Sequence, residues 1–308
     1  MKKSLYIAIL LAVSSNFYAQ KSWEFGLQAG AAAYQGETNP SYFALEAAKS
    51  ITPQAGLLVR YNLNPQWTVE FNAHYGTLSG SDANADNEER RKRNLSFRTN
   101  LITAALQADY NLFGYQPYNM EQPVSPYVFA GAEYFNINPQ AEYNGTWYNL
   151  QPLGTEGQGL AGREKKYSLH NIAIPMGAGL RVALSENWAV GAEFGIRKTF
   201  TDYIDDVGGT YMRAPELAKG NGELAAALGN RTGEVGVYSD FRTGSVRGGK
   251  NDDDWYSFVN ISVSHLLYTN TPRGERGRGR TKFGCPKWLQ RAGSGKKSKP
   301  KSSTRRRY

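Results

Sequence analysis

The stretch QWTVEFNAHYG, residues 66–76, alternates apolar and polar side chains with a period of two. One face carries apolar side chains from Trp67 to Tyr75, and the other carries polar ones from Thr68 to His74. This period predicts a β-strand with one apolar and one polar face.

Seven further segments repeat the pattern. Each is close to or longer than the ~9–11 residues that a tilted membrane strand needs. The pattern slips by one residue near 98–101, which predicts a bulge, and Pro175 predicts a local break in the ladder. The segments are residues 22–34, 54–62, 95–112, 126–136, 168–184, 187–200 and 254–268.

The polar face combines glycines with single charges in the middle of most segments. A soluble sandwich seldom has this pattern, whereas a small barrel in lipid turns its apolar face outward and fills its lumen with small residues and paired charges. The sequence therefore predicts an all-β fold, an eight-stranded antiparallel transmembrane β-barrel. Its expected lumen charge network consists of Glu24, Arg60, Glu70, Asp109, Glu133, Arg181, Glu193 and Arg197.

Short and long connections alternate along the chain, which is typical of outer-membrane barrels with short periplasmic turns and long outer loops. Residues 1–19 have a basic start, a short apolar core and a small residue at Ala19, and predict a secretory signal peptide. Residues 20–268 would form the outer-membrane barrel and residues 269–308 a basic periplasmic tail. No apolar run reaches the ~18 residues of a membrane helix.

The tail holds fourteen Lys and Arg residues and one acidic residue, Glu275, while the rest of the chain is mildly acidic. A short apolar segment, residues 283–289, lies between basic stretches of the tail. This arrangement predicts docking on an acidic periplasmic protein. Because the protein is expected to be exported, nucleic acid is not expected as a partner. The expected partner-binding residues are Phe283, Trp288, Leu289, Lys282, Lys287 and Cys285.

Cys285 is the single cysteine of the chain, so no internal disulfide can form. In the oxidising periplasm, an intermolecular disulfide with a partner is expected. A free thiol, or a disulfide between two copies, is the alternative.

Two acidic stretches flank the longest loop, and calcium binding by their carboxylates is one interpretation. The other is a solvated rim paired with arginines, and on this reading the chain needs no metal and no cofactor. The calcium candidates are Asp202, Asp205, Asp206, Asp252, Asp253 and Asp254.

Catalysis is not expected. His74, Ser79 and Asp82 lie close in sequence and raise the possibility of an outer-membrane lipid enzyme. A polar lumen histidine explains His74 more simply, since no spacing here defines a nucleophile and its base.

Five stretches carry a further resemblance: WEFGL (23–27), AYQGETNP (33–40), AIPMG (173–177), RKTFTDYIDDVGGTY (197–211) and DDWY (253–256). Together they resemble the PorG family, outer-membrane barrel subunits of the type IX secretion machinery. The resemblance implies a non-catalytic barrel that anchors a periplasmic ring, built by a ring-forming lipoprotein and its soluble partner, for protein secretion and gliding motility. A stand-alone barrel that binds ligands or maintains the envelope through its outer loops is the alternative.

Overall fold

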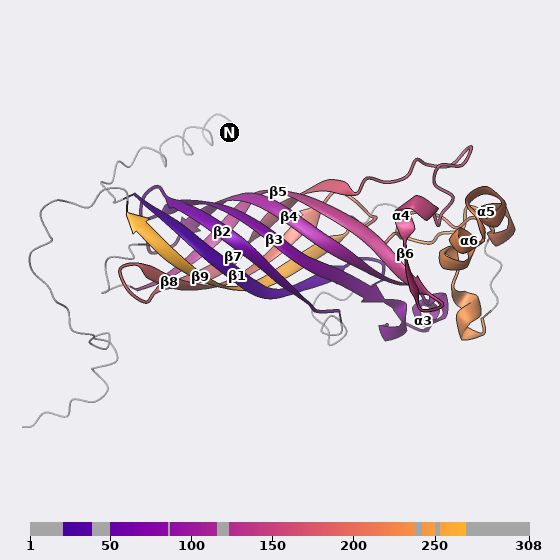
Figure 1. The fold of residues 1–308 in the computed structure, drawn as a ribbon, viewed down its shortest axis with the longest axis horizontal. Coiled ribbons are helices and arrows are strands. Elements are labelled where there is room, and N and C mark those ends of the chain that lie inside the picture. Colours follow the sequence, from indigo (N-terminus) through magenta and orange to yellow (C-terminus); the bar gives the residue numbers. More distant parts are fainter. Residues whose placement is uncertain are drawn as a thin grey trace, which may run out of the picture.

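Eight long strands form a single antiparallel sheet that closes on itself (Figure 1). The computed structural model describes residues 21–38, 50–85, 87–115, 123–237, 242–249 and 253–268. The barrel strands are β1 (Ser22–Gln35), β2 (Thr52–Asn62), β3 (Trp67–Ser81), β4 (Ser96–Asn111), β5 (Val124–Tyr143), β7 (His170–Ala183), β8 (Trp188–Thr199) and β9 (Trp255–Tyr268).

Strand pairing shows that the barrel is closed. Each strand pairs with its neighbours in the order β4-β3-β2-β1-β9-β8-β7-β5, and β4 also pairs with β5. The predicted eight-stranded antiparallel barrel is thus confirmed, with one strand for each predicted segment. The sequence missed a short ninth strand, β6 (Thr146–Asn149), which pairs only with β5 beyond the barrel.

The expected bulge near residues 98–101 is wrong. β4 pairs without a break to both neighbours through this stretch, for example Arg98 with Ser79 and with Gln140. The pattern changes because Phe97 and Leu101 face a hydrophobic core inside the barrel, near the end that carries the long loops. The apolar side therefore moves from the wall to the interior while the register is kept. At Pro175 the β5–β7 ladder is interrupted, as predicted.

The outside of the barrel is an apolar belt. Large apolar side chains on the wall are exposed. Phe194, for example, is 46% exposed, and Leu27 and Ile261 are each 66% exposed. Trp23 packs on Tyr61, and Trp67 on Tyr110, toward the end with the short turns. An apolar band bordered by aromatic side chains is the surface that outer-membrane barrels present to lipid. No helix among the described residues is long and apolar enough to cross a membrane.

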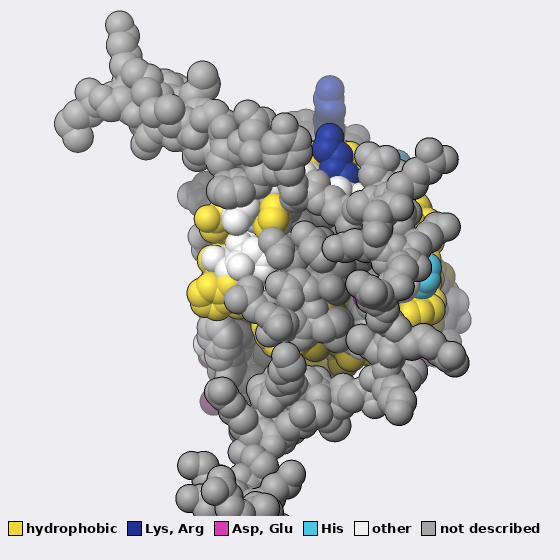
Figure 2. Space-filling model, turned by 90° about the vertical axis from the view of Figure 1, so that its left-hand side faces the viewer, with side chains coloured by type: hydrophobic (Ala, Val, Ile, Leu, Met, Phe, Trp, Pro, Cys, Tyr) yellow, Lys and Arg dark blue, Asp and Glu magenta, His cyan; other side chains and the backbone are white. Residues whose placement is uncertain are grey.

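The two ends of the barrel differ. The described chain enters and leaves at the end with the short turns, where hydrophobic side chains lie around the rim (Figure 2). The other end carries the long loops and the helices of the part of the chain that the structure describes (Figure 1). These are η1 (Asp82–Asn84), α3 (Glu88–Arg93), α4 (Leu150–Leu153), α5 (Ala214–Asn221), α6 (Glu223–Gly229) and η2 (Thr232–Val235).

We call the loops and helices beyond the strands at this end the cap, residues 82–95, 144–169 and 200–254 where described. The cap has its own packed interior. Leu150 and Leu228 pack against Ala141 of β5, and Leu217 of α5 packs against Ala225 of α6. The outer loops are therefore a folded layer on top of the barrel.

Candidate functional site

The interior of the barrel contains a buried ion-pair network near the end with the short turns. Nη1 of Arg60 lies 3.5 Å from Oε2 of Glu24, and its Nε donates to Glu70. Glu24 also accepts hydrogen bonds from Asn62 at 2.8 Å and from Ser264 at 3.1 Å. Both carboxylates are fully buried, so Arg60 holds three strands together through charges that water does not screen.

Arg181 extends this network across the lumen. It pairs with Asp109, and its Nη2 lies 3.9 Å from Oε2 of Glu70. Its guanidinium stacks 4.1 Å above the ring of Tyr127, whose hydroxyl donates to Glu193 at 2.8 Å. The cation therefore joins β7 to β4, strands that are not neighbours in the sheet.

A third arginine occupies the middle of the barrel. Nε of Arg197 lies 3.6 Å from Oε2 of Glu133, and its Nη1 donates to the carbonyl of Gly195 at 2.7 Å. Its guanidinium lies 4.2 Å above the ring of Phe258. A Cβ at residue 195 would collide with Arg197, so glycine there makes room for the arginine.

All eight predicted lumen residues lie inside the barrel, each at most 6% exposed. Above them the interior is hydrophobic, with Tyr34, Leu78, Phe135 and Tyr256 among the side chains that fill it. The lumen is therefore filled by paired charges near one end and by a hydrophobic core near the other.

His74 and Ser79 lie on opposite faces of β3. His74 faces the lumen, where its Nε2 lies 2.6 Å from the side-chain oxygen of Gln28, while Ser79 alternates to the outer face. Asp82 pairs with Arg93, and its Oδ2 also accepts a hydrogen bond from the amide of Leu95. These residues therefore do not form a nucleophile–base pair.

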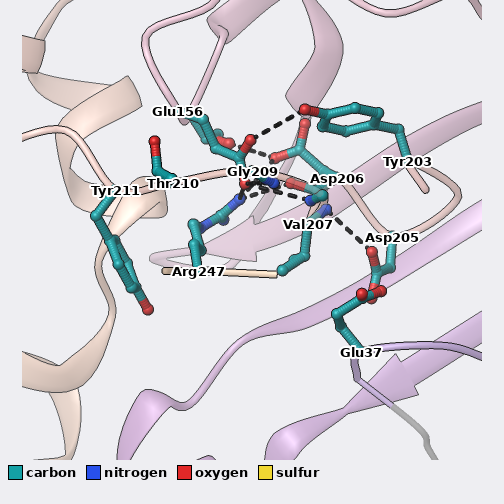
Figure 3. A network of polar contacts seen from close by, with 12 residues as sticks. Glu37, Glu156, Tyr203, Asp205, Asp206, Val207, Gly209, Thr210, Tyr211 and Arg247 are labelled. Atoms are coloured by element: carbon teal, nitrogen blue, oxygen red, sulfur yellow. Dashed lines mark hydrogen bonds and ion pairs between the residues drawn. The ribbon is translucent and has the colours of Figure 1, made fainter. Parts of the chain in front are cut away.

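The cap is centred on a buried arginine, Arg247 (Figure 3). Its Nη1 donates to Oε1 of Glu156 at 2.9 Å and to the carbonyl of Asp206 at 2.6 Å. The same Glu156 oxygen accepts hydrogen bonds from the amides of Gly208 and Gly209 at 3.3 and 3.2 Å. One ion pair thus joins the loop after α4 to both ends of the β8–β9 loop.

Arg93 of α3 attaches the cap to the barrel rim, and the sequence analysis missed it. It pairs with both oxygens of Asp82, at 2.7 and 2.8 Å, and donates to the carbonyls of Glu37 and Arg247. Helix α3 begins after Asn87, whose side chain caps its N-terminus. Asn87, the glutamates after it and the basic last turn are sequence signals that could have predicted this helix.

The acidic residues of the longest loop have different roles. Asp206 lies beside Arg247 and accepts a hydrogen bond from Tyr167 at 2.6 Å. Asp253 lies 3.6 Å from Lys198 on the outer wall. Asp205 accepts hydrogen bonds from the amide and hydroxyl of Thr38 at 3.1 and 3.0 Å. Asp202 and Asp254 lie close to Glu37, which the sequence analysis did not include.

Asp252 lies outside the described residues, and so do the tail residues Lys282, Phe283, Cys285, Lys287, Trp288 and Leu289. The expected docking segment of the tail and the intermolecular disulfide therefore stay predictions.

Burial raises the pKa of Asp206 to about 7, although Arg247 beside it favours the charged form. The folded cap therefore keeps a proton that the unfolded loop releases near its ordinary pKa of about 4. This contribution to the stability of the cap is complete below pH ~4 and is lost as the pH rises through about 7.

We expect the opening equilibrium of the cap to increase between pH 4 and 7, by up to about tenfold per pH unit. Hydrogen exchange of residues 200–215, corrected for intrinsic rates, would show the increase. A chelator in the buffer keeps metal ions from affecting the measurement. Asp206→Asn should remove the part of the dependence that Asp206 contributes and leave the part from Asp202, whose pKa is also raised. Protection that grows as the pH rises would contradict this assignment.

Comparison with known proteins places residues 2–221 in one family, whose description is a domain of unknown function, DUF6089. No curated protein sequence matches the chain.

Three solved barrels are similar in structure. Neisserial surface protein A has 10% identity and a TM-score of 0.39, and the match covers 79% of this chain and 96% of that one. OprG of Pseudomonas aeruginosa has 12% identity and a TM-score of 0.37, with 81% and 98% covered. Ail of Yersinia pestis, solved with the heparin analogue sucrose octasulfate, has 10% identity and a TM-score of 0.36, with 80% and 99% covered.

Similarities of this size carry no functional argument, whereas the family match spans most of the chain. The chain belongs to the family described as domain of unknown function DUF6089.

Proposed function

We propose that this chain is a non-catalytic outer-membrane barrel that anchors a periplasmic assembly, and that the assembly is the ring of the type IX secretion machinery. One observation carries the anchoring role. The lumen is filled along its length by the Arg60, Arg181 and Arg197 networks and by the hydrophobic core above them. A barrel with a filled interior and an apolar wall can hold a complex in the membrane without opening a path through it.

The finer assignment rests on the resemblance to the PorG family. Its two most specific stretches, residues 33–40 and 197–211, contact each other, since Thr38 donates two hydrogen bonds to Asp205. The two stretches are therefore parts of one hydrogen-bonded structure at the barrel rim, although Thr38 and Asp205 are 167 residues apart in sequence. This supports treating the stretches as a single inherited feature.

Exposed apolar side chains at the opposite end also support anchoring. Leu63, Phe113 and Leu184 lie beyond the strands on the short turns and are 42%, 77% and 58% exposed. If the cap faces outward, these turns face the periplasm and offer apolar contacts to a partner there.

The purified, folded protein is expected to form no large stable channels in planar lipid bilayers. The filled lumen leaves no continuous aqueous path for ions. Insertion should first be confirmed by a heat-modifiable shift on gels. Steps of conductance comparable with those of an open porin would contradict the sealed interior and the anchoring role derived from it.

Ending the chain after Tyr268 is expected to abolish capture of a periplasmic lipoprotein complex from mildly solubilised outer membranes. The full chain should capture it, and less strongly as salt rises through ~0.1–0.5 M, because residues 269–308 are strongly basic. The shortened barrel should remain heat-modifiable. If it keeps full secretion and full capture, the anchoring proposal is wrong.

A second candidate, a stand-alone barrel acting through its outer loops, is favoured by the packed interior of the cap around Leu150, Leu217 and Leu228. A folded cap of this kind could present a binding surface. The same truncation separates the two, because a barrel that acts through its cap would not need residues beyond Tyr268.

A further inference from the structure

Three carboxylates meet where the cap joins the barrel, and each comes from a different segment. Glu37 follows β1, Asp202 lies in the loop after β8, and Asp254 immediately precedes β9. One oxygen of each lies within 4.8 Å of the others. The chain brings them together from positions up to 217 residues apart.

The oxygens that face one another are not satisfied by the protein. Both carboxylate oxygens of Asp202 and Oε2 of Glu37 are shut off from solvent, and no backbone amide or cationic side chain among the described residues donates a hydrogen bond to them. Buried acceptors without donors are costly, and a buried carboxylate needs a partner of opposite charge. These oxygens point to a ligand that the protein itself does not supply.

The remaining oxygens are held in place by neutral donors. Oε1 of Glu37 accepts from the amide of Gly249 at 3.0 Å. Asp254, which is fully buried, accepts from the hydroxyl of Tyr34 at 2.6 Å and from the amide of Ile204 at 2.8 Å. The neutral donors therefore position the acidic groups without supplying positive charge.

Gly36 makes this approach possible. A Cβ at that position would collide with the carboxylate of Asp254 and the hydroxyl of Tyr34. Glycine therefore lets the backbone before Glu37 pass close to Asp254.

Two nearby cations, Arg93 and Lys198, are committed elsewhere. Arg93 is paired with Asp82 and approaches Glu37 only at its backbone carbonyl. Lys198 pairs with Asp253 on the outer wall. Among the described residues, no Lys or Arg forms an ion pair with Glu37, Asp202 or Asp254. In line with this, burial and the neighbouring carboxylates raise the pKa of Asp202 to about 9 and that of Glu37 to about 7, so that without a cation the two carboxyl groups share a proton.

We propose that Glu37, Asp202 and Asp254 bind a divalent cation, calcium, which fixes the cap to the rim of the barrel. The three side chains offer only oxygen donors, which suit hard cations and not zinc or copper. Oxygens bound to one calcium ion at ~2.3–2.6 Å can be up to ~5 Å apart, which accommodates the observed spacing. Water molecules or carbonyl oxygens would complete the 6–8 ligands that calcium takes.

This site does not depend on the proposed secretion role, since it concerns the closure of the outer end. A bound ion would join the segment after β1 to the loop before β9. Removing it would leave three acidic groups without the cation that joins their segments, so the cap should loosen at its attachment while the barrel strands stay paired.

The test uses the full-length protein, refolded and stripped with a chelator, then titrated with calcium chloride alone. Isothermal titration calorimetry should show one saturable site per chain. Hydrogen exchange within residues 201–209 should slow about tenfold or more on saturation. Terbium, a luminescent substitute for calcium, should bind the same site and be displaced by calcium.

Asp202→Asn keeps the shape of the side chain and removes one charge. It should weaken calcium binding about tenfold or more, and Glu37→Gln should do the same. Asp253→Asn is the matched control, because it is a neighbouring aspartate that pairs with Lys198 outside the cluster, and it should leave the affinity unchanged. A heat-modifiable gel shift confirms that each variant is folded.

No saturable calcium binding to the folded protein would overturn the proposal, and so would equal affinities of Asp202→Asn and Asp253→Asn. Magnesium binding as tightly as calcium would overturn the assignment to calcium.

Discussion

Replacing Arg60 with alanine is expected to destabilise the folded barrel by about 3–5 kcal/mol, the usual cost of removing one partner from a buried ion pair. Glu24 and Glu70 are both fully buried and would lose the cation between them. Arg181 would compensate only in part, because it is bound to Asp109 and its Nη2 lies 3.9 Å from Glu70. Urea unfolding in lipid vesicles, followed by tryptophan fluorescence, measures the loss.

Lys198→Ala is the matched control for this experiment. Its ion pair with Asp253 is also made by a barrel strand, at 3.6 Å, but both side chains are more than a third exposed. Exposed pairs of this kind contribute about 0–1 kcal/mol. Equal losses for the two variants would mean that the lumen network does not hold the barrel together.

The barrel could be predicted because lipid and lumen impose opposite requirements on alternate residues. Every strand therefore carries the period of two along the membrane-facing part of its length, as Trp67 to Tyr75 do. The prediction fails beyond the lipid belt, at Phe97 to Leu101, where the interior itself becomes hydrophobic. Reading the apolar side as the outer wall then produced a bulge that does not exist.

The lumen residues could be predicted, but only some of their partners could. Arg60 and Glu70 lie opposite each other in the β2–β3 hairpin, so the short turn between them fixes their pairing. Arg181 and Asp109 come from strands that are not neighbours, and their contact depends on how far the strands are staggered around the barrel. Local sequence contains no measure of that stagger.

The cap was the least predictable part. Asp206 pairs with Arg247, 41 residues away, and Asp202 lies beside Glu37, 165 residues away. Contacts of this kind come from loop packing, which has no sequence period. Helix α3 is the exception, since Asn87 and the charges that follow it define both of its ends.

Arg247→Ala is expected to destabilise the cap locally by about 3–5 kcal/mol while leaving the barrel folded. The change leaves Glu156 and Asp206 buried without their cation, at 4% and 0% exposure. It also removes the hydrogen bond to the carbonyl of Asp206, so the two ends of the β8–β9 loop lose their common partner. Limited proteolysis of the folded protein should then cut within residues 200–237 at least about tenfold faster, while the strands stay protected and heat-modifiable.

Lys92→Ala is the control, because its ion pair with Glu88 on α3 is largely exposed and contributes little. If both variants are cut at the rate of the unaltered protein, Arg247 does not hold the cap closed, and the fold of the outer loops must rest on the apolar contacts of Leu150, Leu217 and Leu228 instead.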